Sequence, residues 1–141
     1  MNLSSFYSVL LTDKVEALSE FYQKHFQMQV TFESDWYVSL RKEGREGSFQ
    51  LALLKSDHST IPKSFRHRPK GTILNFEVEK ADRIYEQLIK NSKLPVHLDI
   101  RDEDWGQRHF ITSDPDNNLL DIIELIEPSE EFLAKYTEGL K

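Results

Sequence analysis

The side chains of this chain best suited to chemistry are its histidines and a few acidic and aromatic residues. The five histidines are His25, His58, His67, His97 and His109. No two of them have the i, i+4 spacing with which a helix presents two imidazoles to a zinc ion. A histidine isolated on a strand is usually packed or hydrogen-bonded. Of the five, His109 is the one that we expect in a pocket.

The common signatures of covalent and nucleotide chemistry are missing. With no cysteine, the sequence excludes disulfides, thiolate metal ligands and a cysteine nucleophile. It also contains no Gly-x-Ser-x-Gly elbow, no phosphate-binding loop and no dinucleotide fingerprint. The sequence therefore predicts no familiar nucleophile–base pair.

Trp105 and Arg108 lie in a turn-like segment, DEDWGQR, and both are expected to contact a ligand. A large apolar ring in a turn gains little unless it closes over a ligand or packs against another part of the chain. Arg108 can meet a ligand anion, or it can form a salt bridge with one of the neighbouring carboxylates. The sequence alone does not decide between a ligand contact and a salt bridge for Arg108.

The composition narrows the class of protein. A chain of 141 residues with 38% hydrophobic content is expected to form one domain. The net charge of −6 argues against nucleic-acid binding, and the basic stretch at 63–70 is interpreted as a solvated loop. No apolar run is long enough for a membrane helix, and the N-terminus lacks a secretion signal. We expect a cytoplasmic protein with neither a nucleic-acid partner nor a membrane partner.

The elements that must position these residues follow the same order twice. In the first half, a strand at 5–11 precedes a helix that Asp13 and Glu16 would begin as a capping box and that ends near His25. Three β-rich runs then follow at 29–33, 36–42 and 48–54. The first half is thus predicted to be βαβββ.

The second half repeats that order. A strand at 71–78 and a helix at 81–90 are followed by strands at 95–100, 109–113 and 119–126. Apolar positions of the halves match at a constant offset of 67 residues, as in Phe6 and Ile73, which indicates an internal duplication. We predict one domain at 1–127, with modules at about 1–55 and 71–127, a linker at about 56–70 and a helical tail at 128–141 capped by Ser129.

Three stretches make the sequence resemble the glyoxalase/bleomycin-resistance/dioxygenase, or vicinal-oxygen-chelate, superfamily. They are FYSVLLTDKVEALSEFYQKHF, LNFEVEKADRIYEQL and WGQRHFITSDPDNNLLDIIE, which together span most of residues 6–124. The resemblance implies an α+β fold in which two βαβββ modules form an incomplete eight-stranded barrel. It also implies a cavity for a small molecule, often with a divalent metal, and a homodimer.

In metal-using members, the first and fourth strand of each module carry one ligand each. The corresponding residues here are Phe6, Gln50, Ile73 and Asp121, and the resemblance places no metal ligand at the two apolar positions. Asp121 follows DPDNNLL at the position usually held by Glu. If Phe6 and Ile73 raise its pKa, Asp121 can act as a general base; the alternative is a hydrogen bond to Gln50.

The two apolar positions make the sequence most similar to the bleomycin-resistance branch, and we therefore expect a largely apolar pocket that binds a drug or metabolite, aromatic or cationic, without a cofactor. Candidate wall residues are Trp36, Tyr37, Phe49, Trp105 and Phe110, any of which can instead belong to the core. The full set of predicted contacts is Phe6, Trp36, Gln50, Ile73, Trp105, Arg108, His109, Phe110 and Asp121. The alternative is a metal-dependent lyase, isomerase or dioxygenase of the same superfamily that uses a displaced ligand set.

Overall fold

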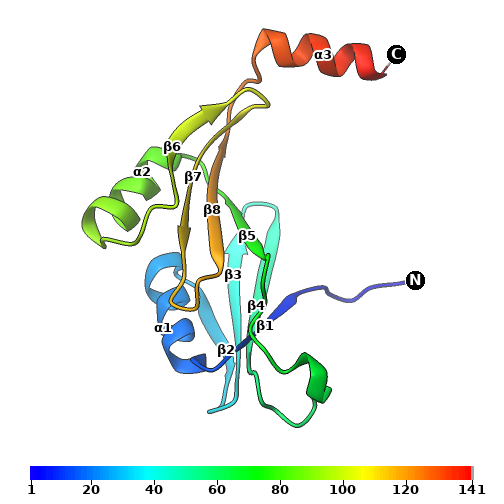
Figure 1. Ribbon diagram of the computed structural model, residues 1–141, viewed down its shortest axis with the longest axis vertical. Coiled ribbons are helices and arrows are strands. Elements are labelled where there is room, and N and C mark those ends of the chain that lie inside the picture. The colour runs from blue at the N-terminus through cyan, green and yellow to red at the C-terminus, as the bar shows by residue number, and fades with distance from the viewer. Residues whose placement is uncertain (141) are drawn as a thin grey trace. The chain divides into compact units, whose positions relative to one another are not determined.

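The structure, a computed structural model, describes residues 1–140 of the chain and the side chains of residues 1–135. Lys141, the last residue of the predicted tail, lies outside the described residues. The chain divides into two compact units, residues 1–71 and 72–141, which we call module one and module two. Each contains a strand, a helix and three more strands, so the predicted βαβββ repeat is confirmed (Figure 1).

Module one is a four-stranded sheet with one helix. Its elements are β1 (Ser8–Thr12), α1 (Val15–Phe26), β2 (Gln29–Glu33), β3 (Tyr37–Gly44) and β4 (Gly47–Lys55). The strand order is β1-β4-β3-β2, with β1 and β4 parallel and the other pairs antiparallel. A parallel pair cannot be joined by a tight hairpin, and here the chain between β1 and β4 includes α1.

One face of the module-one sheet forms the core under α1. Buried Leu10, Val38, Leu40, Leu51 and Leu53 alternate along their strands with residues of the opposite face. We call that opposite side the helix-free face of module one. It carries Val9 and Leu11 of β1, Tyr37 and Ser39 of β3, and Gln50, Ala52 and Leu54 of β4.

Two sequence predictions for the start of module one are wrong. The first strand begins at Ser8, so Phe6 precedes it and is 86% exposed. Asp13 does not cap α1; the Lys14 amide donates to Thr12 Oγ1 at 2.9 Å, and the Asp13 carboxylate accepts a hydrogen bond from Ser56. A hydroxyl brought from the end of β4 thus competes for the side chain that the capping box needed.

Module two repeats the topology, with the order β5-β8-β7-β6 and a parallel β5–β8 pair. Its elements are β5 (Ile73–Glu77), α2 (Ala81–Tyr85) continued by a π-helical turn η2 (Glu86–Asn91), β6 (Leu98–Glu103), β7 (Gln107–Ser113) and β8 (Leu119–Leu125). The two sheets found in residues 1–140 are open and mixed, and the α+β class is confirmed.

The remaining segments are short. A 3-10 turn, η1 (Lys63–Phe65), lies in the predicted linker, and α3 (Glu130–Leu140) forms the tail. Ser129 Oγ accepts a hydrogen bond from the Phe132 amide at 3.1 Å, so the predicted cap is confirmed. Within residues 1–140, no helix is long and apolar enough to cross a membrane.

Candidate functional site

Contacts with α2 establish which face of the module-two sheet its helix covers. Phe110 meets Tyr85 of α2 edge to face, with ring centroids 5.1 Å apart. Glu124 of β8 accepts a hydrogen bond at 2.9 Å from the Ala81 amide at the start of α2. Since neighbouring strand residues point to opposite faces, His109 and Asp121 lie on the other side, the helix-free face of module two.

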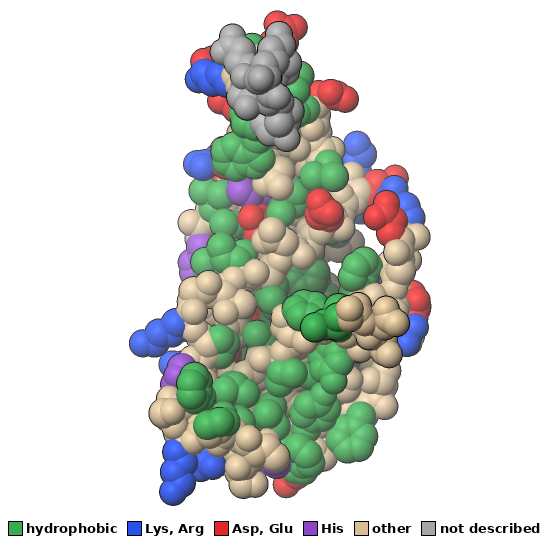
Figure 2. Space-filling view, turned by 90° about the vertical axis from the view of Figure 1, so that its right-hand side faces the viewer, with side chains coloured by type: hydrophobic (Ala, Val, Ile, Leu, Met, Phe, Trp, Pro, Cys, Tyr) green, Lys and Arg blue, Asp and Glu red, His purple; other side chains and the backbone are tan. Residues whose placement is uncertain are grey.

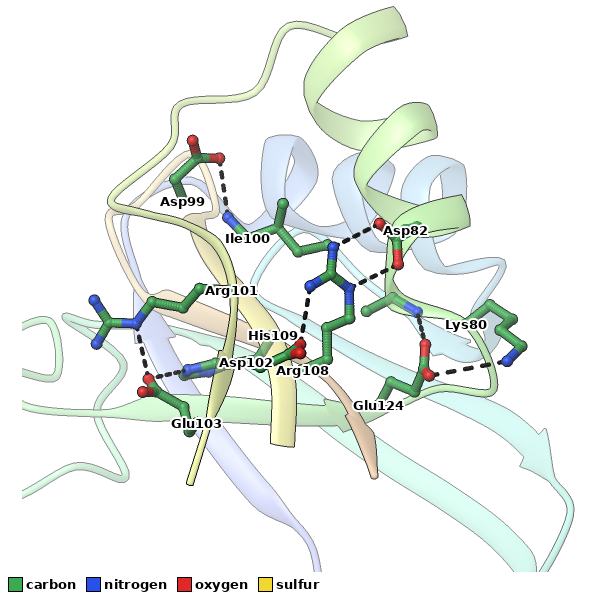
Figure 3. Close-up of polar contacts among 11 residues, drawn as sticks. Lys80, Asp82, Asp99, Ile100, Arg101, Asp102, Glu103, Arg108, His109 and Glu124 are labelled. Carbon is green, nitrogen blue, oxygen red and sulfur yellow. Dashed lines mark hydrogen bonds and ion pairs between the residues drawn. The ribbon is translucent and has the colours of Figure 1, made fainter. Parts of the chain in front are cut away.

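His109 joins two carboxylates on that face. Its Nδ1 lies 2.8 Å from Asp121 Oδ1, and its Nε2 lies 2.7 Å from Glu103 Oε2. Arg101 Nε donates to the same Glu103 oxygen at 3.0 Å. Figure 3 shows Glu103 held between Arg101 and His109. We call Arg101, Glu103, His109 and Asp121 the His109 network.

Strand register brings this network together. In the β6–β7 hairpin, Glu103 pairs with Gln107 and Arg101 with His109, so Glu103 and His109 are diagonal neighbours on one face. In the β7–β8 pair, Asp121 is opposite Ile111, again diagonal to His109. Three of its four side chains are largely buried: that of His109 is 7% exposed, and those of Glu103 and Asp121 are each 13% exposed, whereas that of Arg101 is 58% exposed.

Burial and hydrogen bonding act in opposite directions on His109. Burial by itself lowers the pKa of His109, but the hydrogen bonds to Glu103 and Asp121 outweigh it, and the pKa is raised above 6.5. The same contact with His109 lowers the pKa of Glu103. The network therefore favours a positive imidazole beside negative carboxylates.

The stability of the fold is expected to fall at alkaline pH. The pKa of His109 is raised on folding, so its protonation adds to the free energy of unfolding. This contribution is fully present below the ordinary pKa of 6.5 and is lost as pH rises through the pKa of His109 in the folded protein. Urea unfolding between about pH 6 and about pH 9 measures this loss as a decrease in unfolding free energy. In a His109→Gln variant the decrease should be smaller; an identical decrease would mean that other groups cause it.

Two predicted contacts belong to the helix-covered side of module two. Phe110 is fully buried against α2, so its expected place in a pocket wall is wrong and the core alternative holds. Arg108 donates to both carboxylate oxygens of Asp82, at 2.8 and 2.9 Å, and to Asp102 at 2.9 Å, as Figure 3 shows. These hydrogen bonds raise the pKa of Arg108. Of the two alternatives for Arg108, the structure has the salt bridge.

The other predicted contacts are more accessible. Trp105 lies in the β6–β7 turn, is half exposed, and donates from Nε1 to Gln107 Oε1 at 2.9 Å. Ile73 is half exposed on β5, and Gln50 is half-buried on the helix-free face of module one. Trp36 stacks on His58 of the linker, with centroids 4.3 Å apart. Contact of these four residues with a ligand stays a prediction.

Sequence reasoning missed Arg101 and Glu103 as partners of His109. A signal for them exists in the hairpin itself. Asp104, Trp105 and Gly106 form the turn between β6 and β7. Alternate residues on either side of this turn lie on the same face of the hairpin, so Glu103 and Arg101 of β6 lie beside His109 of β7. Asp121 was singled out, and the partner that the structure gives it is His109 of its own sheet.

A hollow of about 460 Å³ lies elsewhere, beside the start of α1 in module one. It is lined by charged residues of both signs: Asp13, Lys14, Glu16, Glu20, Asp35 and Lys55. None of the predicted ligand contacts lines it, and its character is not that of the apolar pocket expected from the sequence.

The residues at the family's metal positions do not fit a divalent ion. In module one the pair is Phe6 and Gln50, and in module two it is Ile73 and Asp121, so each module offers one oxygen-bearing side chain. Glu103, His109 and Asp121 cannot serve together instead, because the carboxylates contact different ring nitrogens on different edges of the imidazole. Accordingly, no group of three or more His, Asp or Glu side chains among the described residues has the geometry of a metal site.

Comparison with known proteins agrees with the fold. The model of the glyoxalase-like domain family matches residues 6–127. No protein of curated function matches the chain.

Solved structures with this fold include three informative neighbours. A glyoxalase/bleomycin resistance protein/dioxygenase from Nocardioides has a TM-score of 0.71 at 18% identity, covering 90% of this chain and 86% of that one. A lactoylglutathione lyase from Agrobacterium tumefaciens has a TM-score of 0.65 at 20% identity, covering 88% and 96%. TnmS3, an antibiotic binding protein from Streptomyces sp. CB03234, has a TM-score of 0.65 at 18% identity, covering 89% and 98%.

At these identities the structural neighbours establish the fold, and the family follows from the match of the domain model over most of the chain. The resemblance to the glyoxalase/bleomycin-resistance/dioxygenase superfamily is thereby confirmed. The chain belongs to the glyoxalase-like domain family, within the glyoxalase/bleomycin-resistance/dioxygenase superfamily.

Proposed function

We propose that this protein binds a small organic molecule with an aromatic part, a drug or a metabolite, and that it does so without a metal ion. The observation that carries the proposal is an exposed cluster on the helix-free face of module one. Tyr7, Phe32 and Tyr37 form this cluster, which we call the aromatic patch, and Val9 of β1 lies on the same face.

Contacts within the patch hold its rings together. The ring centroids of Phe32 and Tyr37 lie 5.9 Å apart, and Tyr37 shares a hydrogen bond with Tyr7. Burial and this hydrogen bond raise the pKa of Tyr37. Phe32 is nonetheless 53% exposed, and Tyr7 and Val9 are each 42% exposed. Figure 2 shows hydrophobic side chains gathered over the lower part of one face of the molecule.

An apolar ligand would gain from this surface. Each Å² of apolar surface removed from water is worth about 25 cal/mol, and contiguous exposed apolar patches commonly mark binding sites. Aromatic side chains add a preference for planar partners through stacking and edge-to-face contacts. A flat organic molecule is therefore the class of ligand that the patch fits best.

Module two supports binding without a metal. Asp121 stands at the family's metal position, but its Oδ1 is hydrogen-bonded to a nearly buried imidazole. A divalent ion at Asp121 would lie beside that imidazole and would find no second ligand in Ile73. The metal-dependent lyase, isomerase or dioxygenase remains the alternative, and the lactoylglutathione lyase among the structural neighbours is in keeping with it. The printed name of TnmS3, which shares the fold, is in keeping with a ligand-binding role.

Binding can be tested with a panel of aromatic drug-like compounds. We expect one or more to bind, as seen by isothermal titration and by amide shift changes in β1, β2 and β3, without being consumed. A Phe32→Ala variant should bind at least about fivefold more weakly, since loss of a stacking ring removes on the order of 1 kcal/mol or more. Phe65→Ala, which removes an exposed ring from the linker, is the matched control.

Two outcomes would count against the proposal. One is binding that Phe32→Ala and Phe65→Ala weaken equally or not at all. The other is activity on a substrate that requires a divalent ion bound stoichiometrically in protein purified without added metal.

A further inference from the structure

We propose that His109 is a fixed internal cation: its imidazolium binds Asp121 and Glu103 at once and takes the place at which a divalent metal would balance the charge of Asp121. This inference goes beyond the proposed function, because it does not depend on which organic molecule binds.

The first step is geometric. Both ring nitrogens of His109 lie within 2.8 Å of a carboxylate oxygen, Nδ1 with Asp121 and Nε2 with Glu103. An ionised carboxylate only accepts hydrogen bonds, and a neutral imidazole has one N–H. With a neutral ring, one contact would oppose a nitrogen lone pair and a negative oxygen. An imidazolium donates at both nitrogens and satisfies both contacts.

The second step is charge. Glu103 and Asp121 carry one negative charge each, and the His109 imidazolium and Arg101 carry one positive charge each, so the His109 network sums to zero. A largely buried carboxylate without a partner is costly, which is the need that a metal meets in other proteins. Here the chain supplies the cation itself.

The third step is competition. Asp121 Oδ1 already contacts His109 Nδ1 at 2.8 Å. A divalent ion held by Asp121 would therefore lie beside the imidazolium, and the repulsion between the two cations would oppose its binding. The wild-type protein should show no preference for bound Mg²⁺ or Mn²⁺, although its family includes metal users.

The protonation state can be read directly by NMR. In the full-length ¹⁵N-labelled protein at about pH 7.5, long-range ¹H–¹⁵N spectra should show both nitrogens of His109 protonated. His97 is the internal control, because its Nε2 meets the neutral hydroxyl of Ser113 at 2.8 Å. A single protonated nitrogen on His109, with the other carrying a lone pair, would overturn the proposal.

A pair of substitutions separates charge from packing. His109→Gln keeps a side chain of similar length but removes the cation, and it should lower the melting temperature. Adding Asp121→Asn to that variant should restore most of the loss, because it removes the carboxylate that His109 compensated. A purely structural role for the ring predicts no rescue. If His109→Gln does not fold, a folded His109→Gln/Asp121→Asn double variant would support the proposal still more strongly. A double variant that also fails to fold would count against it.

Addition of metal ions is the last test of the internal-cation proposal. Addition of Mg²⁺ or Mn²⁺ should leave the melting temperature of the wild type unchanged. A stabilising shift that Asp121→Asn abolishes would overturn the internal-cation proposal. If no aromatic compound binds, or if Phe32→Ala does not weaken binding, the expected His109 spectra are unchanged. The ligand-binding proposal and the internal-cation proposal can therefore fail separately.

Discussion

Replacing Phe110 with alanine is expected to lower the free energy of unfolding by about 3–5 kcal/mol. Phe110 is fully buried on β7 and packs edge to face on Tyr85. Removing the ring deletes buried apolar surface and leaves a cavity that a helix and a sheet can only partly close. Urea unfolding followed by circular dichroism gives the change directly.

The matched control is Phe49→Ala, another phenylalanine in a strand but 57% exposed, for which we expect a loss of at most about 1 kcal/mol. A similarly small loss for Phe110→Ala would mean that the ring is not part of a close-packed core. That result would return Phe110 to the pocket wall in which the sequence placed it.

A Gly106→Ala substitution is expected to destabilise the protein by about 2–4 kcal/mol. Gly106 has a φ of +103°, which L-residues rarely adopt, and an added Cβ would lie 2.7 Å from the backbone oxygen of Ile126. Strain and overlap with backbone thus add together. Thermal and urea unfolding of the variant measure the loss.

Gly71→Ala is the control for strain alone, because Gly71 has a φ of +74° but nothing within 4 Å of the added carbon. It should cost about 1–2 kcal/mol. Because Gly106 also closes the turn that places Glu103 beside His109, its substitution should move the NMR signals of His109 as well. Equal losses for both glycines would contradict the contact with Ile126.

Much of the fold was predictable because the local signals agree with one another. The strand and helix order of both modules and the Ser129 cap follow from periodicity, turn residues and capping chemistry. Strand ends were harder. Phe6 and Tyr7 favour strands, but β1 begins only at Ser8, which pairs with Leu51 of β4. Since β4 itself extends back to Gly47, β1 stops pairing before its partner strand ends, and local propensity does not reveal where that happens.

The site was predictable only in part, for a related reason. His109 and Asp121 were identified, yet their partnership depends on diagonal register between β7 and β8, and that of Glu103 on the hairpin register. Arg108 and Phe110 flank His109 in sequence but point to the opposite face. A shift of one residue in register would have exchanged the two sets.

The parallel strand pairs also set an order of events during synthesis. β1 pairs with β4 through Ser8 and Leu51, and β5 pairs with β8 through Ile73 and Leu119. Each first strand must therefore wait for more than 40 further residues before its partner leaves the ribosome. Module one can complete its sheet while module two is still being translated. Until β4 has been synthesised, β1 lacks the strand with which it pairs, and its unpaired edge is open to aggregation even though α1, β2 and β3 have already emerged.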